Sequence, residues 1–155
     1  MLFLDLYIFI VRRFKMMLNN FSEKEIFART LYGEARGEVF KFGDAALKGV
    51  ASIIINRFKE QTWYGKTIKA VCLKKWQFSC WNESDPNLSI VLAPEIKCTV
   101  FDLCLGVADL FLKKNTSILD VTNGANHYHH RAIFPLWTVK KRPTCQIGNH
   151  IFYKL

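Results

Sequence analysis

Apolar residues recur at helical spacing along most of this chain, and the first such stretch has a clear start. Ser22, followed three positions later by Glu25, has the sequence of a capping box, which predicts that a helix begins near Ser22. Apolar residues at helical spacing follow, until Gly33 and Gly37 weaken the helix. We therefore expect Glu34 in the last turn of this helix or in the bend after it.

Further helices are expected downstream. A second helix should cover about Asp44–Phe58, because the apolar residues there form one stripe, and a short helix should cover Thr67–Leu73. A long helix should start just after Pro94, which suits a first helical turn, and end near Leu112. The aromatic stretch 76–82 is bounded by turn-forming residues, so we expect it to be a loop.

The pattern changes after Leu119. Residues 120–124 are rich in turn formers, and short alternating segments follow, the last of them at 147–153. This pattern predicts a small element of two or three strands that closes against the helices. The expected fold class is therefore mainly α, with a helical core and a small C-terminal β element.

The first twenty residues form a separate apolar and basic segment. Positions 2–11 are apolar except for one acidic residue, and three cations follow by position 15. The apolar run is too short to span a bilayer comfortably, and a signal peptide normally carries its positive charges before the apolar run. We interpret residues 1–20 as signal-like, or as lying ahead of a true start at Met16 or Met17, and residues 21–155 as one domain.

The chain carries 22 Lys and Arg against 13 Asp and Glu, which gives a formal net charge of +9. Such a charge favours polyanions, whether nucleic acid, anionic lipid or acidic wall polymers. The cations are scattered, and no recognised nucleic-acid motif occurs among them. We therefore expect no nucleic-acid partner.

The five cysteines are odd in number, so they cannot all pair within one chain, and none forms the CxxC pair of a zinc ribbon. Cys98 and Cys104 lie in a helical apolar pattern, where we expect buried free thiols. A disulfide, if one forms, should involve Cys72, Cys80 or Cys145.

The stretch Leu31-Tyr32-Gly33-Glu34-Ala35-Arg36-Gly37-Glu38 places two carboxylates four positions apart. If the helix continued through Glu38, both would lie on one face, about 5–6 Å apart at Cβ. A carboxylic acid against apolar walls can have its pKa raised enough to donate a proton at neutral pH, which is the chemistry that breaks a glycosidic bond. The alternative is a pair of solvated helix charges beside Arg36 or Lys41.

A second cluster is the run Asn126-His127-Tyr128-His129-His130, with His150 later. On a strand His127 and His129 face the same side, so a zinc site that also uses Glu34 is sterically feasible. No HExxH motif and no clear third ligand accompany these histidines. The other interpretations are a sugar-binding strand that uses His127 and Tyr128, or histidines with structural roles alone.

The segment Gln77-Phe78-Ser79, together with Trp81 and Trp137, combines aromatic rings with amides and hydroxyls. Pyranose rings pack on aromatic faces while amides hydrogen-bond to hydroxyl and N-acetyl groups, so these residues are candidates for a carbohydrate site. The alternative is that the aromatic residues close a small core.

Taken in order, five segments resemble the cell wall hydrolases of the spore-cortex-lytic (SleB-like) type. The resemblance covers roughly Phe21 to Tyr153, nearly the whole expected domain. The matching segments are Leu31-Tyr32-Gly33-Glu34-Ala35-Arg36-Gly37-Glu38, Gly49-Val50-Ala51-Ser52-Ile53-Ile54-Ile55-Asn56-Arg57, Gln77-Phe78-Ser79-Cys80-Trp81, Asn123-Gly124-Ala125-Asn126-His127-Tyr128 and Ile147-Gly148-Asn149-His150-Ile151-Phe152-Tyr153.

The resemblance implies a lysozyme-like, mainly helical (α+β) catalytic domain that acts on peptidoglycan glycan strands. The implied activity is lytic transglycosylation between N-acetylmuramic acid and N-acetylglucosamine, with Glu34 as general acid and base and no metal or other cofactor. We expect Glu38 to assist by tuning Glu34 or by holding its partners. The residues expected to bind substrate are Tyr32, Gln77, Phe78, Ser79, Trp81, Asn126, His127, Tyr128 and Trp137.

Two other classes of protein stay open. A zinc-dependent amidase would cut the peptide stem of peptidoglycan and use the histidine cluster. A non-enzymatic basic envelope protein would bind the wall without releasing fragments. In each case the expected location is the cell envelope, in the periplasm or the cell wall, with anionic wall polymers as further candidate partners.

Overall fold

The computed structural model describes residues 2–94, 98–113 and 119–155, and most of these residues are helical. The sheet has three strands and lies at the C-terminal end, which confirms the expected fold class. The helices are α1 (Leu2–Asn20), α2 (Glu23–Ala35), α3 (Val39–Phe42), α4 (Ala45–Glu60), α5 (Ile68–Leu73), α6 (Asn87–Leu92) and α7 (Thr99–Lys113), the 3₁₀ turns are η1 (Arg36–Glu38), η2 (Ser79–Trp81) and η3 (Leu136–Thr138), and the strands are β1 (His127–His130), β2 (Cys145–Ile147) and β3 (His150–Tyr153).

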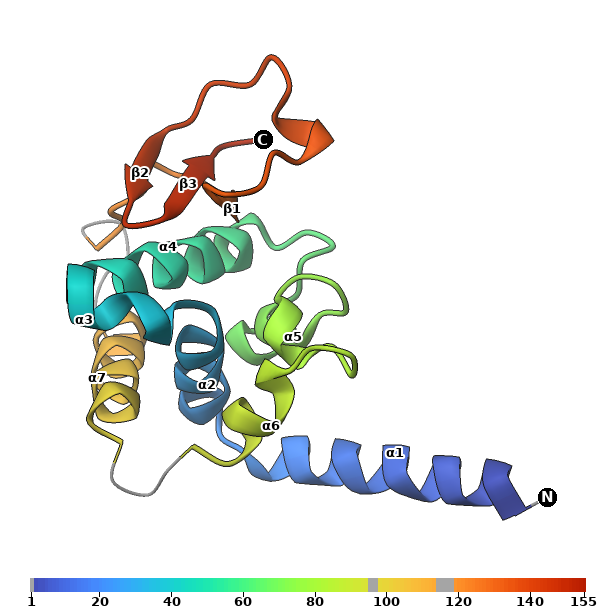
Figure 1. Cartoon of the computed structure of the whole chain (residues 1–155). Coiled ribbons are helices and arrows are strands. Elements are labelled where there is room, and N and C mark those ends of the chain that lie inside the picture. The colour runs from blue at the N-terminus through green and yellow to red at the C-terminus, as the bar shows by residue number, and fades with distance from the viewer. Residues whose placement is uncertain (1, 95–97, 114–118) are drawn as a thin grey trace.

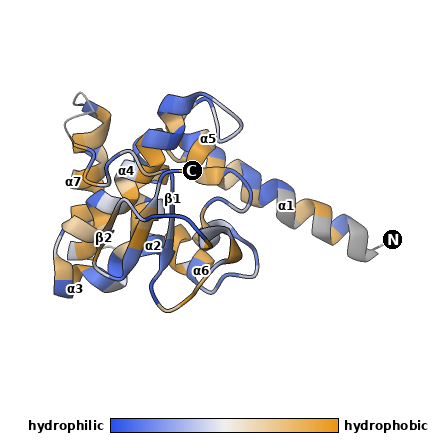
Figure 2. Ribbon diagram, turned by 90° about the horizontal axis from the view of Figure 1, so that it is seen from above, coloured by the Kyte–Doolittle hydropathy of each residue, from blue (hydrophilic) through white to orange (hydrophobic). Residues whose placement is uncertain are grey.

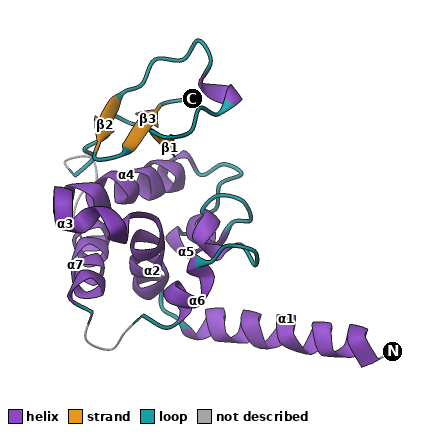
Figure 3. Ribbon diagram, in the orientation of Figure 1, coloured by secondary structure: helices purple, strands orange, loops and turns teal. Residues whose placement is uncertain are grey.

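Helix α2 packs against α4, α5, α6 and α7 in the helical body (Figure 1). Its residues from Ile26 to Tyr32 are all buried, so neighbours surround this helix instead of covering one face. The small sheet lies at one end of the molecule, over α4 (Figure 3). The end of α2 therefore lies where side chains from the helical body and from the sheet can meet.

The start and the end of α2 both follow from local sequence. The Ser22 side chain accepts a hydrogen bond from the Glu25 amide, and the Glu25 carboxylate accepts one from the Ser22 amide, so the expected capping box is formed. The helix ends at Ala35, whose φ of −135° and ψ of 1° depart from helical values. Glu34 thus lies in the last turn, as expected.

The expected helices at Asp44–Phe58 and Thr67–Leu73 are confirmed as α4 and α5. The described part of the long helix, α7, starts at Thr99 rather than just after Pro94, and residues 95–97 lie outside the described part. The stretch expected to be a loop contains the turn η2, and α6, which follows it, was not expected. Apolar runs of this length carry too little periodicity to be assigned.

The strand order in the sheet is β1-β3-β2, and both pairs are antiparallel. Tyr128 of β1 lies opposite Phe152 of β3, which is fully buried. A Cβ atom added at Gly49 of α4 would come within 2.8 Å of the Phe152 ring, so the missing side chain lets the sheet approach α4 closely.

Helix α1 leaves the helical body and extends away from it (Figure 1). Hydrophobic and hydrophilic residues alternate along its coloured part (Figure 2). Among the described helices, none combines the length and the apolarity needed to cross a bilayer. Whether α1 is a signal-like segment or lies ahead of the true start stays a prediction.

The thiols of Cys72, Cys80, Cys98, Cys104 and Cys145 are all free in the structure, so the disulfide considered for three of them does not form. Cys104 is a buried thiol, as expected. Cys98 lies directly ahead of α7 and is only half-buried, which differs from the expected buried thiol within the helix.

Candidate active site

The carboxylate of Glu34 is held from two sides. Its Oε2 accepts a 2.7 Å hydrogen bond from the hydroxyl of Tyr128 on β1, and its Oε1 accepts a 3.2 Å hydrogen bond from the backbone amide of Cys80 in η2. The side chain of Glu34 is half-buried. Three segments that lie far apart in the sequence therefore fix one carboxylate that is still partly exposed.

Gly33 explains how η2 comes so close to Glu34. A Cβ atom added at this position would lie 2.5 Å from Cβ and 2.7 Å from Sγ of Cys80, and 2.8 Å from a methyl group of Val91. Only a residue without a side chain lets η2 and α6 pack on the last turn of α2. Gly33 and Glu34 thus act together, since the glycine makes room for the Cys80 amide that hydrogen-bonds to the Glu34 carboxylate.

Tyr128 is suited to be a donor. Burial, followed by the negative charge of Glu34, raises the pKa of the Tyr128 hydroxyl well above its usual value, so this group keeps its proton at any physiological pH. Its ring packs on Phe152 with 5.8 Å between centroids. The sheet therefore presents the phenol in a fixed position in front of Glu34.

Arg57, near the end of α4, is a residue that the sequence interpretation did not assign to the site. It is 5% exposed, its Nε donates a 2.8 Å hydrogen bond to the carbonyl of Asn126, and its guanidinium lies over the rings of Tyr64 and Phe78. Burial lowers its pKa, and Tyr128 and Glu34 are among the groups that oppose this shift. Arg57 therefore joins the strand that carries Tyr128 to the core, and adds positive charge near Glu34. The sequence signal that could have identified Arg57 is its position at the end of the apolar stripe of this helix.

Glu38 belongs to a different network from Glu34. Because α2 ends at Ala35 and η1 follows, the two carboxylates are not on one helix face. Oε2 of Glu38 accepts a 2.8 Å hydrogen bond from the amide of Asn149, and Oε1 lies 3.5 Å from Nδ1 of His150. Gly148, with φ +59°, has no room for a Cβ beside Oε2 of Glu38. Glu38 thus binds the turn between β2 and β3 to the helical body.

His150 connects the two networks. Its ring lies edge-on to that of Tyr128, with 5.0 Å between centroids, and it is 6% exposed. Burial lowers its pKa, while the charges of Glu38 and then Glu34 oppose that shift. The order in space is therefore Glu34, Tyr128, His150, Glu38, which makes Glu38 a supporting group for the residue that holds Glu34.

The histidines of β1 have partners other than each other. His127 and His129 both pack on Trp137, and the Nδ1 atoms of these histidines lie 2.8 Å from Oδ1 of Asn126 and 3.0 Å from the carbonyl of His130. Within the described residues, no group of three or more His, Cys, Asp and Glu side chains is arranged to hold a metal ion. The histidine cluster is thus an aromatic and hydrogen-bonded layer at the edge of the sheet.

Some of the residues expected to bind substrate are buried. Phe78 is 1% exposed and lies under Arg57, and Tyr32 is 9% exposed, with its ring packed edge-on to Phe101. The amide of Asn126, 4% exposed, donates hydrogen bonds to Glu60 and to the carbonyl of Leu155. These placements leave little of the three side chains accessible, because their polar or aromatic groups are used within the fold, so direct substrate contact by them stays a prediction.

The remaining candidates are accessible to different degrees. Ser79 is exposed beside the Cys80 amide, and Gln77, His127, Tyr128 and Trp137 are half-buried. Trp81 is also half-buried, but its indole donates a 2.9 Å hydrogen bond to the hydroxyl of Thr30 in α2, so one edge of this ring is anchored in the core. The structure thus brings Tyr128 and the segment that contains Ser79 to Glu34, whereas Trp137 packs on His127, His129 and Tyr153.

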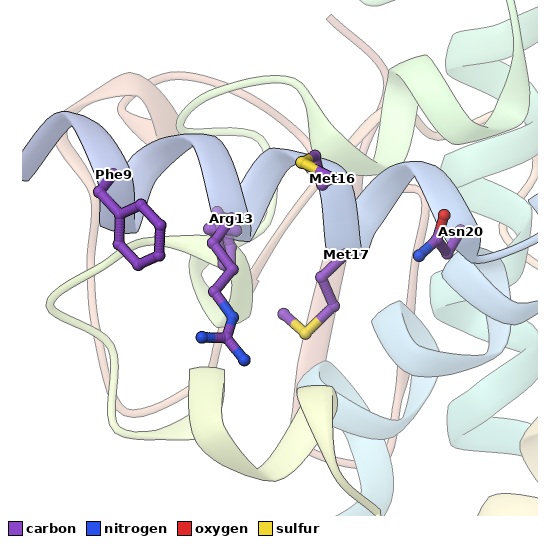
Figure 4. Close-up of a pocket in the computed structure, with 6 residues that line it drawn as sticks. Phe9, Arg13, Met16, Met17 and Asn20 are labelled. Atoms are coloured by element: carbon purple, nitrogen blue, oxygen red, sulfur yellow. The ribbon is translucent and has the colours of Figure 1, made fainter.

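Cavities occur elsewhere on the molecule. One of about 640 Å³ runs along α1, where Phe9, Arg13, Met16 and Met17 line it (Figure 4). Another, of about 430 Å³, lies between the end of α2 and α6 and includes Arg36. Neither is lined by Glu34 or Tyr128, so neither cavity is the candidate site.

The fold of the chain matches a solved structure, the crystal structure of the catalytic domain of the Bacillus cereus SleB protein. The TM-score is 0.55 at 22% sequence identity, and the match covers 88% of this chain and 94% of that one. The fold is therefore that of a SleB-type catalytic domain. No curated protein matches the chain.

The family described as Cell Wall Hydrolase matches residues 43–153. The chain belongs to this family, which confirms the resemblance found in the sequence. The matched range begins after Glu34 and Glu38. The roles of these two carboxylates therefore depend on the geometry described above.

Proposed function

We propose that this cell wall hydrolase cleaves peptidoglycan glycan strands between N-acetylmuramic acid and N-acetylglucosamine, as a lytic transglycosylase, with Glu34 as its general acid and base. One observation carries the proposal. The Glu34 carboxylate is accessible and is held by the Tyr128 hydroxyl and the Cys80 amide, whereas Glu38 is bound to the β2–β3 turn.

In the proposed reaction, protonated Glu34 gives its proton to the oxygen that links the two sugars, and the bond from that oxygen to the muramoyl anomeric carbon breaks. The muramoyl C6 hydroxyl then attacks the anomeric carbon, and Glu34 takes up the hydroxyl proton. The products are a free N-acetylglucosamine end and a 1,6-anhydro ring on the muramoyl residue. Tyr128 holds Glu34 in one orientation through both proton transfers.

The position of Glu38 supports this route over direct hydrolysis. A retaining hydrolase needs a second carboxylate about 5–5.5 Å from the acid, and an inverting one needs a carboxylate that activates water from farther away. Glu38 is 9% exposed, and its carboxylate is engaged by Asn149 and His150. We therefore give Glu38 a positioning role, through His150 and Tyr128.

The residues near Glu34 also suit a glycan. Ser79 and Gln77 lie in the segment that supplies the Cys80 amide, which supports the proposal that they bind sugar hydroxyl or N-acetyl groups next to the cleaved bond. Trp76, 71% exposed and in the same segment, offers a flat face for a pyranose ring. His127, Tyr128, Trp81 and Trp137 stay candidates for more distant sugars. The proposed place of action is the cell envelope, where the charge of +9 also favours acidic wall polymers.

The test is a digest of purified peptidoglycan with the protein and with Glu34→Gln, followed by mass spectrometry of the soluble fragments. We expect fragments lighter by one water than hydrolysis products, and none from Glu34→Gln. The variant should keep the circular dichroism spectrum and the unfolding temperature of the parent, because the amide can still accept the Tyr128 hydrogen bond.

Other outcomes would replace the proposal. Hydrated reducing ends from the parent would mean true hydrolysis. Free stem peptides released equally by both proteins, and abolished by a chelator, would assign the reaction to an amidase that uses the histidines. Sedimentation with the wall without any released fragment would leave a binding protein.

A further inference from the structure

The segment 131–142, here called the β1–β2 loop, exposes an unusual set of apolar side chains. It projects from the sheet, away from the helical body (Figure 1). Leu136 is 90% exposed, Phe134 85%, Val139 63% and Ile133 56%. Single exposed apolar residues are common, but several close together on one loop indicate a surface that binds something.

The loop is folded, and its fold turns these side chains outward. The Thr138 amide and hydroxyl both donate to the carbonyl of Pro135, at 2.9 and 2.7 Å, and the Lys141 amide donates to the carbonyl of Thr138. At the base of the loop, the Arg131 amide donates a 2.7 Å hydrogen bond to the carbonyl of Asn149. The exposed apolar groups are thus held in place by backbone hydrogen bonds.

Trp137 gives the loop an inner and an outer side. Its ring packs on His127, His129 and Tyr153, with centroids 5.2 to 5.8 Å away, so this indole faces the sheet. Leu136, its neighbour in η3, faces solvent. The outer side of the loop therefore carries Phe and aliphatic groups, while its tryptophan is used within the fold.

The charges around these apolar groups are all positive. Arg131, Lys140, Lys141 and Arg142 flank them, and all four are exposed. The sequence contains no Asp or Glu after Asp120. An apolar tip with a ring of cations is complementary to a lipid surface that has anionic headgroups above its acyl chains.

We propose that the β1–β2 loop binds the surface of an anionic lipid bilayer, with Phe134 and Leu136 inserted among the acyl chains and the flanking cations on the headgroups. A soluble polyanion would use the cations but would leave the apolar side chains in water. A glycan would favour an exposed tryptophan or tyrosine with amide partners, and the outer side of the loop has neither. Because β1 carries Tyr128, a loop bound in this way holds the candidate active site close to the membrane.

The experiment is sedimentation of the full chain with vesicles, either of phosphatidylglycerol mixed with phosphatidylcholine or of phosphatidylcholine alone. The parent should bind the anionic vesicles and bind the neutral ones far more weakly. Phe134→Ser combined with Leu136→Ser should lower the partition coefficient by about a hundredfold or more, since each of the two apolar side chains that leaves the bilayer costs roughly a factor of ten or more. Lys141→Gln combined with Arg142→Gln should lower it about twenty-five-fold, from about fivefold for each cation.

Matched controls separate the loop from the rest of the surface. Phe40→Ser removes a side chain that is 92% exposed on α3, and Lys74→Gln combined with Lys75→Gln removes another exposed pair of lysines. Both should bind like the parent within a factor of about two to three, because neither lies on the loop and long-range charge effects are screened by salt. All of these positions are exposed, so each variant should keep the parent's circular dichroism spectrum.

Three results would overturn the proposal. Equal binding of the parent to neutral and anionic vesicles, or none to either, would remove the lipid surface as the partner. If vesicle binding fell in the variant without the two cations but not in the variant without Phe134 and Leu136, the loop would be a binding patch for soluble polyanions. Binding that survives both loop variants but falls with Phe9→Ser on α1 would assign membrane contact to that helix.

Discussion

The hydroxyl of Tyr128 donates a 2.7 Å hydrogen bond to Oε2 of Glu34, across 94 positions of sequence. The two residues come from different parts of the fold, since Glu34 lies in the last turn of α2 and Tyr128 lies on β1. The candidate active site is therefore completed only when the C-terminal sheet docks on the helical body. We therefore expect residues that hold the sheet in place, such as Arg57 and Glu38, to affect the lytic rate without contacting substrate.

Tyr128→Phe tests the hydrogen bond to Glu34. Loss of a hydrogen bond to a charged group costs about 1.5–3 kcal/mol, so we expect kcat for wall solubilisation to fall about ten- to hundredfold while KM changes little. The ring still packs on Phe152, so the fold should persist. The readout is the initial rate of turbidity loss in a peptidoglycan suspension.

Tyr153→Phe is the matched control for this change. Its hydroxyl lies 3.3 Å from Nε2 of His129 on the same sheet, and no hydrogen bond from it to Glu34 is observed. Its rate should stay within a factor of about three of the parent, in keeping with the smaller net contribution of a neutral hydrogen bond. Equal rates for Tyr128→Phe and the parent would remove the positioning role of Tyr128.

The contrast between local and distant contacts explains how far the sequence could predict this structure. The capping box at Ser22 and the place of Glu34 in the last helical turn depend on neighbours within a few positions, and both predictions were right. The bonds from Tyr128 and Cys80 to Glu34 depend on how distant segments pack, which residue spacing does not encode. The resemblance named the segments that meet, but not their contacts.

The burial of individual aromatic side chains could not be predicted from the sequence either. Phe78 and Trp76 occur two positions apart in one apolar stretch, yet Phe78 is 1% exposed and Trp76 is 71% exposed. Trp76 has φ +68°, a left-handed backbone that turns the chain between them. Composition alone cannot say which ring faces the core. The arrangement with Glu34 and Glu38 on one helix face, considered for the case that the helix continued, does not form, because the backbone of Ala35 ends the helix before Glu38.

Gly33→Ala tests the close contact that brings η2 to Glu34. The added methyl group would overlap Cys80 and Val91, and overpacking of this kind costs about 1–3 kcal/mol of unfolding free energy. Any shift of η2 would also lengthen the hydrogen bond from the Cys80 amide to Glu34. We expect a lower urea midpoint together with a lower lytic rate.

Gly37→Ala is the control, because a Cβ at Gly37 meets no atom within 4 Å. It should leave the lytic rate unchanged and leave stability equal or higher, by up to about 1 kcal/mol, through a more restricted unfolded chain. If the two variants had the same midpoint and rate, the tight packing at Gly33 would not matter for the site.

Glu38→Gln separates positioning from proton transfer. The amide oxygen of glutamine can still accept the hydrogen bond from Asn149, but the charge beside His150 is lost. We expect unfolding free energy to fall by about 1 kcal/mol and the lytic rate to fall clearly less than in Glu34→Gln. Mass spectrometry of the fragments should show the same products as the parent. A variant as inactive as Glu34→Gln but equally stable would make Glu38 a second catalytic carboxylate.

The burial of His150 predicts how stability depends on pH. Burial lowers the pKa of His150 below its usual value of 6.5, and Glu38 and Glu34 only partly oppose this shift. His127 is shifted in the same direction, again mainly by burial. As the pH falls below about 6.5, the unfolded chain therefore binds protons that the folded chain does not. The contribution of these histidines to stability is complete above that pH and is lost progressively below it.

Urea unfolding on either side of pH 6.5 measures this effect. The unfolding free energy of the parent should fall as the pH is lowered through the histidine range, and the fall should be smaller in His150→Gln, which has no proton to bind there. Combining this change with His127→Gln should flatten the dependence further. Because other groups titrate equally in parent and variants, the difference between their slopes isolates the histidines. If the unfolding free energy depended on pH with the same slope in all three proteins, His150 and His127 would bind protons equally well in the folded and the unfolded chain.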